Sequence, residues 1–165
     1  MPASSSRFAV AVHILTLMAA AGDEPLKSEF VACSVNTNAV VIRRLLCALA
    51  RARLVTSQTG SCGGSRLARS SSRITLLDVY RATEAREVFA LHRQPPRRSC
   101  PVGGNIQTVL ESVLEEVEQS VERVLGKITI KQILENVKPP AAASGRKQQA
   151  SRWANQTVLK GQKRC

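Results

Sequence analysis

Residues 36–64 read NTNAVVIRRLLCALARARLVTSQTGSCGG, and this stretch decides the fold. Its first half places apolar side chains at helical spacing, on a stripe that includes Ile42 and Leu49. Thr37 or Asn38 can cap the start of this helix, because Thr and Asn are favoured cap residues. The stretch therefore predicts a helix with one apolar face and arginines on the other.

The second half of the stretch predicts a β-hairpin. LVTSQ at 54–58 is short and contains β-branched residues, as a strand does. SRLA at 65–68 can form the returning strand, and Gly60, Gly63 and Gly64 allow a flexible turn between the two.

Two helices are predicted before this stretch. The first covers about 6–21 and ends at Gly22, a residue type that is common just beyond a helix. The second is short and covers about 27–33. Helix, short helix, tight turn and helix followed by a hairpin is the order of a winged helix-turn-helix. The predicted fold class is therefore mainly α with a small β-hairpin wing.

Two segments follow the predicted wing. Thr75 and Asp78 have the spacing of a capping box, which predicts a helix over about 74–84. Residues 86–104 contain three prolines and are predicted to form a loop.

The longest predicted helix spans about 105–126 and is followed by a short closing helix at 129–135. Its apolar side chains recur along one face, and such a helix usually packs against another. We expect it to join two copies of the chain into a homodimer, with coverage of its own domain's core as the alternative. The expected interface residues are Ile106, Leu110, Val113, Val117, Val121 and Val124.

Aromatic residues make up only 3% of the chain, so the core must be built from aliphatic side chains. This favours helices packed on helices over a β-sandwich. The expected organisation is a winged helix-turn-helix DNA-binding domain at 1–84, a loop at 85–104, a dimerisation helix with the closing helix at 105–138, and a basic disordered tail at 139–165.

The net charge of +12 is distributed unevenly along the chain. Residues 30–77 contain seven Arg and no acidic residue, whereas residues 105–125 contain five Glu and one Arg. Six more basic residues and no acidic one follow Pro139. A basic zone of this length indicates a polyanionic partner such as double-stranded DNA, and the tail should strengthen nonspecific attraction to it.

The cysteines and the apolar runs indicate a cytoplasmic protein without a membrane span. The five cysteines are an odd number and form no C-x-x-C pair, as expected of reduced thiols. Cys47 lies within a helical pattern and is expected to be a small core residue. FAVAVHILTLMAAAG after Arg7 resembles a short signal peptide, but its spacing favours a core helix with His13 partly buried. No stretch reaches the roughly 18 apolar residues of a membrane span.

The start of the second helix of a helix-turn-helix enters the major groove of DNA. Asn can pair with adenine, Thr can bond to base edges, and Val can contact a thymine methyl group. Arginines one turn further along can reach phosphate or a guanine edge, and the wing can approach the DNA backbone or minor groove. Asn38 is also expected to cap the helix. The predicted DNA-binding residues are Asn36, Thr37, Asn38, Val40, Val41, Arg43, Arg44, Ser61, Gly63 and Arg66.

Three segments together resemble one family of proteins. They are SVNTNAVVIRRLLCALARARLV at 34–55, GSCGGSRLARSSSRITLLDVYRATE at 60–84 and CPVGGNIQTVL at 100–110. Over about residues 6–135 the chain resembles the Rrf-two-type winged-helix transcription regulators. The resemblance implies a homodimer that is joined through the long helix, binds a palindromic operator and acts as a repressor.

The loop before the long helix departs from part of that family. Cluster-binding members carry three closely spaced cysteines there, whereas this loop has only Cys100, so we expect no iron–sulfur cluster and no metal. The chain looks closest to the branch with a C-P-V-G loop. Cys100 follows Arg97 and Arg98, and nearby cations lower the pKa of a thiol. It is thus a candidate redox sensor, with an ordinary loop cysteine as the alternative, and a small-molecule effector is left open.

Another departure is Arg53, which stands where the family usually has Gly. Gly suits a left-handed turn, so Arg53 is expected to be strained if the same turn forms. The sequence contains no recognised catalytic motif and is predicted not to be an enzyme. It predicts a sequence-specific DNA-binding transcription regulator. The alternative is a protein–protein interaction module that uses the long helix and binds nucleic acid only nonspecifically.

Overall fold

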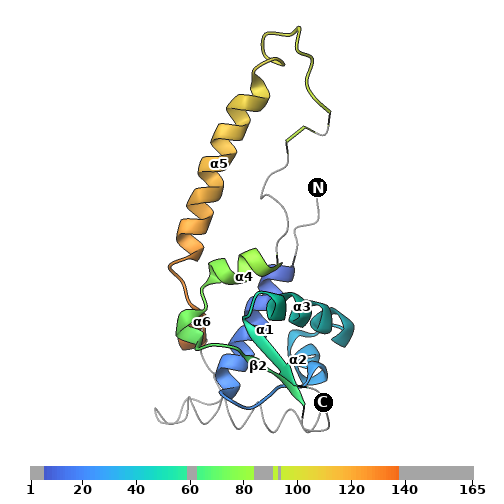
Figure 1. The fold of residues 1–165 in the computed structure, drawn as a ribbon, viewed down its shortest axis with the longest axis vertical. Helices are drawn as coiled ribbons and strands as arrows, with labels where there is room; N and C mark the ends of the chain where they lie inside the picture. Colours follow the sequence, from blue (N-terminus) through green and yellow to red (C-terminus); the bar gives the residue numbers. More distant parts are fainter. Residues whose placement is uncertain (1–5, 59–62, 84–90, 93, 138–165) are drawn as a thin grey trace.

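The computed structural model describes residues 6–58, 63–83, 91–92 and 94–137. Three helices open the fold: α1 (Arg7–Ala21), α2 (Ser28–Val35) and α3 (Ala39–Arg51). The strands β1 (Val55–Gln58) and β2 (Gly64–Leu67) form an antiparallel hairpin. The elements that follow are η1 (Ser71–Arg73), α4 (Leu76–Thr83), α5 (Ile106–Leu125) and α6 (Ile130–Asn136) (Figure 1). The predicted mainly helical fold with a small hairpin is confirmed.

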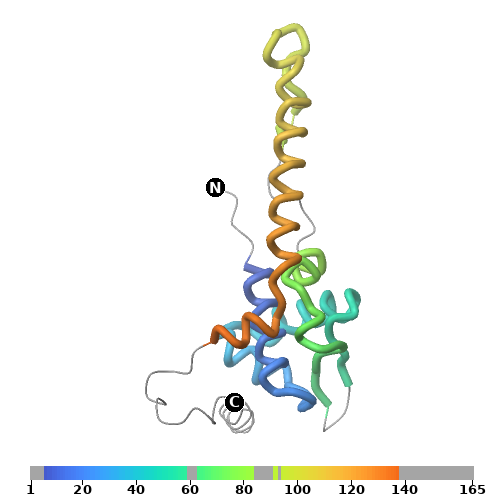
Figure 2. Tube along the Cα trace, turned by 90° about the vertical axis from the view of Figure 1, so that its left-hand side faces the viewer, coloured from blue at the N-terminus to red at the C-terminus, as the bar shows by residue number. Residues whose placement is uncertain are grey.

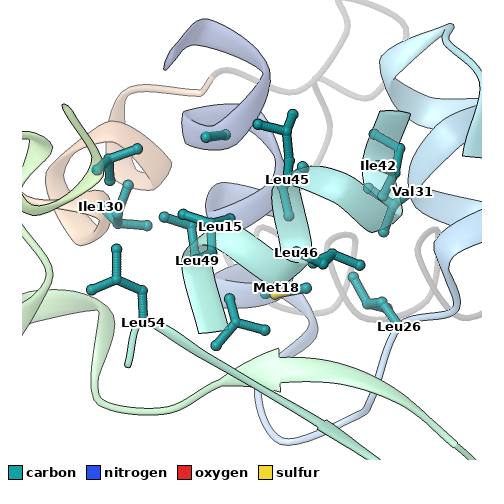
Figure 3. Close-up of a cluster of buried hydrophobic side chains, with 14 of the residues drawn as sticks. Leu15, Met18, Leu26, Val31, Ile42, Leu45, Leu46, Leu49, Leu54 and Ile130 are labelled. Atoms are coloured by element: carbon teal, nitrogen blue, oxygen red, sulfur yellow. The ribbon is translucent and has the colours of Figure 1, made fainter. Parts of the chain in front are cut away.

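The core lies where α1, α3 and the base of the hairpin meet (Figure 3). Leu15 and Met18 from α1 and Leu49 from α3 are fully buried there. The apolar run that follows Arg7 is thus a core helix. Burying a side chain of this size contributes about 1.5–3 kcal/mol, and Leu49→Ala would cost about 2–5 kcal/mol because it also leaves a cavity.

The turn between α2 and α3 is fixed by two asparagines. Asn36 ends α2 in the left-handed region with φ 57°, a conformation that Asn tolerates better than most residues. The Asn38 side chain accepts a hydrogen bond of 2.8 Å from the Val40 N–H, which confirms it as the cap of α3. The turn bends the chain by 110° between α2 and α3, within the range of a helix-turn-helix.

No single helix among the described residues is long and apolar enough to cross a membrane. The bent pair of α2 and α3 meets that criterion by length and composition only when the two are taken together.

The end of α3 requires Arg53 to adopt the left-handed region, with φ 57°. The Arg53 N–H donates to Ala50 O and the Leu54 N–H donates to Leu49 O, each at 2.9 Å. These two bonds form a Schellman motif, and Leu54 and Leu49 are both buried beside it. The strain expected at Arg53 is therefore present in the fold.

The hairpin is attached to the helices by a third segment. Leu26 and Ser65 exchange two backbone hydrogen bonds of 2.9 Å, which fastens β2 to the α1–α2 connection. A Cβ atom at Gly64 would lie 2.9 Å from Leu26 O, so only glycine allows this close approach. The base of the wing is held on the helical core for this reason.

Capping boxes begin both α4 and α6. Thr75 and Asp78 form the first one, as predicted, with the Thr75 N–H donating to Asp78 Oδ2 at 2.9 Å. Thr129 and Gln132 form the second. Ile130 of α6 is fully buried in the same core as α1 and α3 (Figure 3). The closing helix therefore packs into the same core as the helices of the first 84 residues.

Helix α5 extends away from the other helices and the hairpin, and the loop before it lies at its outer end (Figures 1 and 2). It spans 20 residues, about 30 Å at the rise of an α-helix. None of its residues is buried. Its C-terminal part is held by Arg81 of α4, whose Nη2 lies 2.8 Å from Glu122 Oε2.

Two of the predicted core residues lie on the surface. Cys47 is exposed, because it follows Leu46 on α3 by one residue and so points away from the buried side. His13 is also exposed, on the side of α1 that faces α2, where its Nε2 lies 3.3 Å from Ser34 Oγ. In both cases the residues next to it in the sequence are apolar, but the side chain lies on the exposed face of its helix.

Candidate nucleic-acid interface

The N-terminal part of α3 presents apolar side chains to solvent. Val40 and Val41 are 48% and 43% exposed, while Ile42 and Leu45 of the same helix are buried. Arg44 is exposed one helical turn beyond Val40. Exposed valines followed by a cation make a surface that can contact thymine methyl groups and phosphates together.

The three polar residues before α3 have different tasks. Asn38 accepts the N–H of Val40, so its side-chain oxygen is engaged in capping. The backbone N–H of Asn36 donates to carbonyl groups at the end of α2, and Asn36 is an exposed residue. Thr37 is half-buried, and its N–H donates to Ala32 O at 2.9 Å. Asn36 and Asn38 are thus the exposed residues of the three, and the Asn38 side-chain oxygen already accepts a hydrogen bond from Val40.

Arg43 is bound to α2. Its Nη2 donates to Glu29 Oε1 at 2.5 Å, and its Nε donates to Ser28 Oγ at 3.3 Å. The pKa of Glu29 is lowered, first by a hydrogen bond from its own backbone N–H and then by that from Arg43. The carboxylate is therefore ionised at neutral pH, and its ion pair with Arg43 links α2 to α3.

On the wing, the described residues include two of the three predicted contacts. Arg66 is exposed on β2 opposite Thr56 of β1. Gly63 is half-buried just before β2, and Ser61 lies outside the described residues. The Ser57 and Ser65 hydroxyls are 2.8 Å apart across the hairpin and help fix its register.

Glu29 and Ser28 were not predicted as site residues. The signal that could have identified Glu29 is its position, because it is the last acidic residue before the acid-free segment at 30–77. Its contact with Arg43, 14 residues later, depends on how α2 packs against α3. Spacing within one helix could not show it.

The loop before α5 holds Cys100 in a compact turn. The pKa of the Cys100 thiol is lowered by hydrogen bonds from the backbone N–H groups of Gly103 and Val102, rather than by the neighbouring arginines as expected from the sequence. Gly103 approaches Arg97 O so closely that a Cβ atom would lie 2.6 Å from it. Cys100 is exposed, and an accessible thiol with a lowered pKa is the kind that reacts most readily.

A metal cluster does not fit the described residues. No group of three or more His, Cys, Asp or Glu side chains within them is arranged to hold a metal ion. The loop at 86–104 contains a single cysteine, so it lacks the thiolates that a cluster requires.

The apolar face of α5 forms an open groove of about 520 Å³. Val113 and Val124 on this face are 52% and 59% exposed, and Val109 beside it is 56% exposed. Ile106, Leu110, Val117 and Val121 are half-buried. The groove lining is Val113, Glu116, Val117, Ser120, Val121, Val124 and Leu125.

Comparison with known proteins places this architecture among bacterial regulators. The family model described as "Rrf2: Iron-dependent Transcriptional regulator" matches residues 4–136. YwnA of Bacillus subtilis (strain 168), named as an HTH-type transcriptional regulator, is 41% identical over 134 residues, which are 81% of this chain and 98% of that protein.

Solved structures agree with this match. A crystal structure described as that of a DNA-binding protein is 38% identical, with a TM-score of 0.63 over 78% of this chain and 99% of that one. The structure of T. potens IscR is 25% identical, with a TM-score of 0.62, and the similarity covers 87% of this chain and 92% of that one.

Proposed function

This chain belongs to the Rrf2 family of transcriptional regulators and is a DNA-binding regulator rather than an enzyme, and we propose that it acts as a homodimer joined through α5. In this proposal each protomer places α3 in the major groove of one half of a palindromic operator. The wing of each protomer contacts the DNA backbone or minor groove beside it.

The observation that carries the dimer is the uncovered apolar face of α5. Val113, Val117 and Val124 lie on one side of a helix that extends away from its own domain. Leaving such a stripe in water is unfavourable by about 25 cal/mol for each Å² of apolar surface. A second α5 offers the same stripe, and two equal surfaces that pair about a two-fold axis form a closed dimer.

The palindromic operator follows from the dimer. A two-fold axis relates the two α3 helices, so the DNA sequence that they read is expected to be symmetric as well. A protein held on such a site blocks access to it, and we therefore propose that the regulator is a repressor. DNA as its target and reduced cysteines both suit the cytoplasm.

We propose that no iron–sulfur cluster takes part in this function. The support is the lack of fit between the described residues and a metal, together with the single cysteine of the loop. Cys100 is exposed and its thiol pKa is lowered, so we propose it as a site at which an oxidant or electrophile reacts.

The proposal is tested by measuring mass and DNA binding together. Light scattering should give twice the 17.9 kDa of one chain. Val117→Glu places a charge within the apolar face and should give a single chain that binds the palindrome at least tenfold more weakly. Gln119→Glu adds the same charge on the opposite side of α5, where Gln119 is exposed, and should remain dimeric.

Two results would contradict the proposal. One is a single-chain mass for the unmodified protein at micromolar concentration. The other is equal affinity of the dimer for the palindrome and for a duplex of random sequence.

A further inference from the structure

The ion pair between α2 and α3 assigns different roles to two neighbouring arginines. Arg43 is engaged with Glu29 and Ser28, whereas Arg44 has no ion pair with any residue in the described ranges. Both partners of the Arg43–Glu29 pair remain accessible, with side chains 56% and 55% exposed. The pair is therefore open to solvent beside α3, the helix placed in the major groove under the proposed function.

The two bonds to α2 use one edge of the Arg43 guanidinium. Nε and Nη2 form that edge and donate to the Ser28 hydroxyl and the Glu29 carboxylate. Within the part of the chain that the structure describes, Arg43 makes no bond through Nη1. Nη1 and the second hydrogen of Nη2 thus leave a pair of parallel donors, the geometry that matches guanine O6 and N7.

The charge of the pair disfavours a phosphate-binding role for Arg43. A guanidinium beside a carboxylate is nearly neutral at a distance, and the carboxylate repels phosphate. Reading a base edge depends on orientation rather than on net charge, and a side chain held at one edge loses less rotamer freedom on binding. Arg44 retains its full charge, so the phosphate-binding role falls to Arg44.

We propose that Glu29 is a positioning residue for sequence recognition, which orients Arg43 to read a guanine in each half-site of the operator. This inference rests on the proposed DNA-binding function and specifies how that function selects its sequence. Ser28 supports the same orientation through Nε. Glu29 itself need not touch the DNA.

The inference is tested by selecting binding sites from a randomised palindrome with the full chain and with variants. The unmodified protein should select guanine at one position of each half-site. Arg43→Lys keeps the charge but removes the paired donors, and should reduce discrimination at that position by about 5- to 150-fold, the range measured for bidentate base contacts.

Glu29→Gln gives a result that a simple change of charge cannot give. It should reduce discrimination at the same position by several fold, because Arg43 is no longer held in one orientation. It should also tighten binding to random duplex, because a carboxylate near the phosphates is lost. Glu24→Gln is the matched control: Glu24 is exposed and has no ion pair among the described residues, so its guanine selection should be unchanged.

The outcomes separate this inference from the function on which it rests. If Glu29→Gln tightens specific and random binding equally and keeps the guanine preference, Glu29 is only a repulsive charge and the inference is overturned. The same holds if Arg43→Lys keeps full discrimination. If the unmodified protein shows no base preference at any position, the proposed function fails and this inference fails with it. Ser28→Ala, with the carboxylate retained, should show a smaller loss at the same position and provides a second test.

Discussion

Replacing Arg53 with Gly is expected to stabilise the protein, because Arg53 holds a left-handed conformation that glycine adopts without a steric penalty. Arg53 has φ 57° and closes the Schellman motif that ends α3. The left-handed region costs a residue with a Cβ atom about 1–2 kcal/mol. Glycine loses more backbone entropy on folding, by about 0.5–1 kcal/mol. The middle values of the two ranges leave a gain of about 0.5–1 kcal/mol for Arg53→Gly.

The assay is urea unfolding at constant protein concentration, supported by thermal melting. A gain of this size should raise Tm by about 1–4 °C for a chain of this length. Arg53→Ala is the matched control, since it removes the same exposed side chain and charge but keeps the Cβ atom and its strain. Equal stability of the Gly and Ala variants would refute the reasoning, because the gain would then come from lost charge repulsion.

Asp78→Ala removes the cap of α4 and should cost about 1 kcal/mol in urea unfolding at pH 7. Burial raises the pKa of Asp78, but hydrogen bonds from Thr75 and the charge of Arg69 outweigh burial and leave the pKa lowered. The cost of the substitution should therefore be constant above about pH 5 and shrink as the pH falls through the lowered pKa. An undiminished cost at pH 2 would contradict this. The lowered thiol pKa of Cys100 should make it react with iodoacetamide at lower pH than an ordinary cysteine. A plot of reaction rate against pH with its midpoint at or above pH 9.0 would count against the hydrogen bonds described. Gly64→Ala should cost about 1–3 kcal/mol in thermal unfolding, since its Cβ would press on the backbone of residue 26; unchanged stability would show that the wing relaxes freely.

Local signals predicted most of the secondary structure. The apolar spacing around Leu45 and Leu49 and the glycines of the hairpin each act over a few residues, and each gave the observed element. The caps at Asn38 and Asp78 were predictable for the same reason. The strain at Arg53 was expected only from the family resemblance, which implies Gly at this position.

Properties that depend on distant contacts were harder to predict. Cys47 and His13 lie in apolar surroundings in the sequence, and only the packing of the helices shows that they face outward. The Glu29–Arg43 pair joins α2 to α3. Ile130 brings α6 into the core that α1 and α3 form, although α6 lies far from both in the sequence. A single sequence specifies the elements more directly than it specifies which of them meet.

The place of α6 in the core has a consequence for how the protein is made. Ile130 is fully buried, and its N–H donates to Ile74 O at 2.9 Å, across the whole of α5 and the loop before it. During synthesis the helices and hairpin of residues 6–83 emerge first, yet their apolar surface stays incompletely covered until α6 follows. The core of the first helices therefore cannot be completed until both α5 and α6 have left the ribosome.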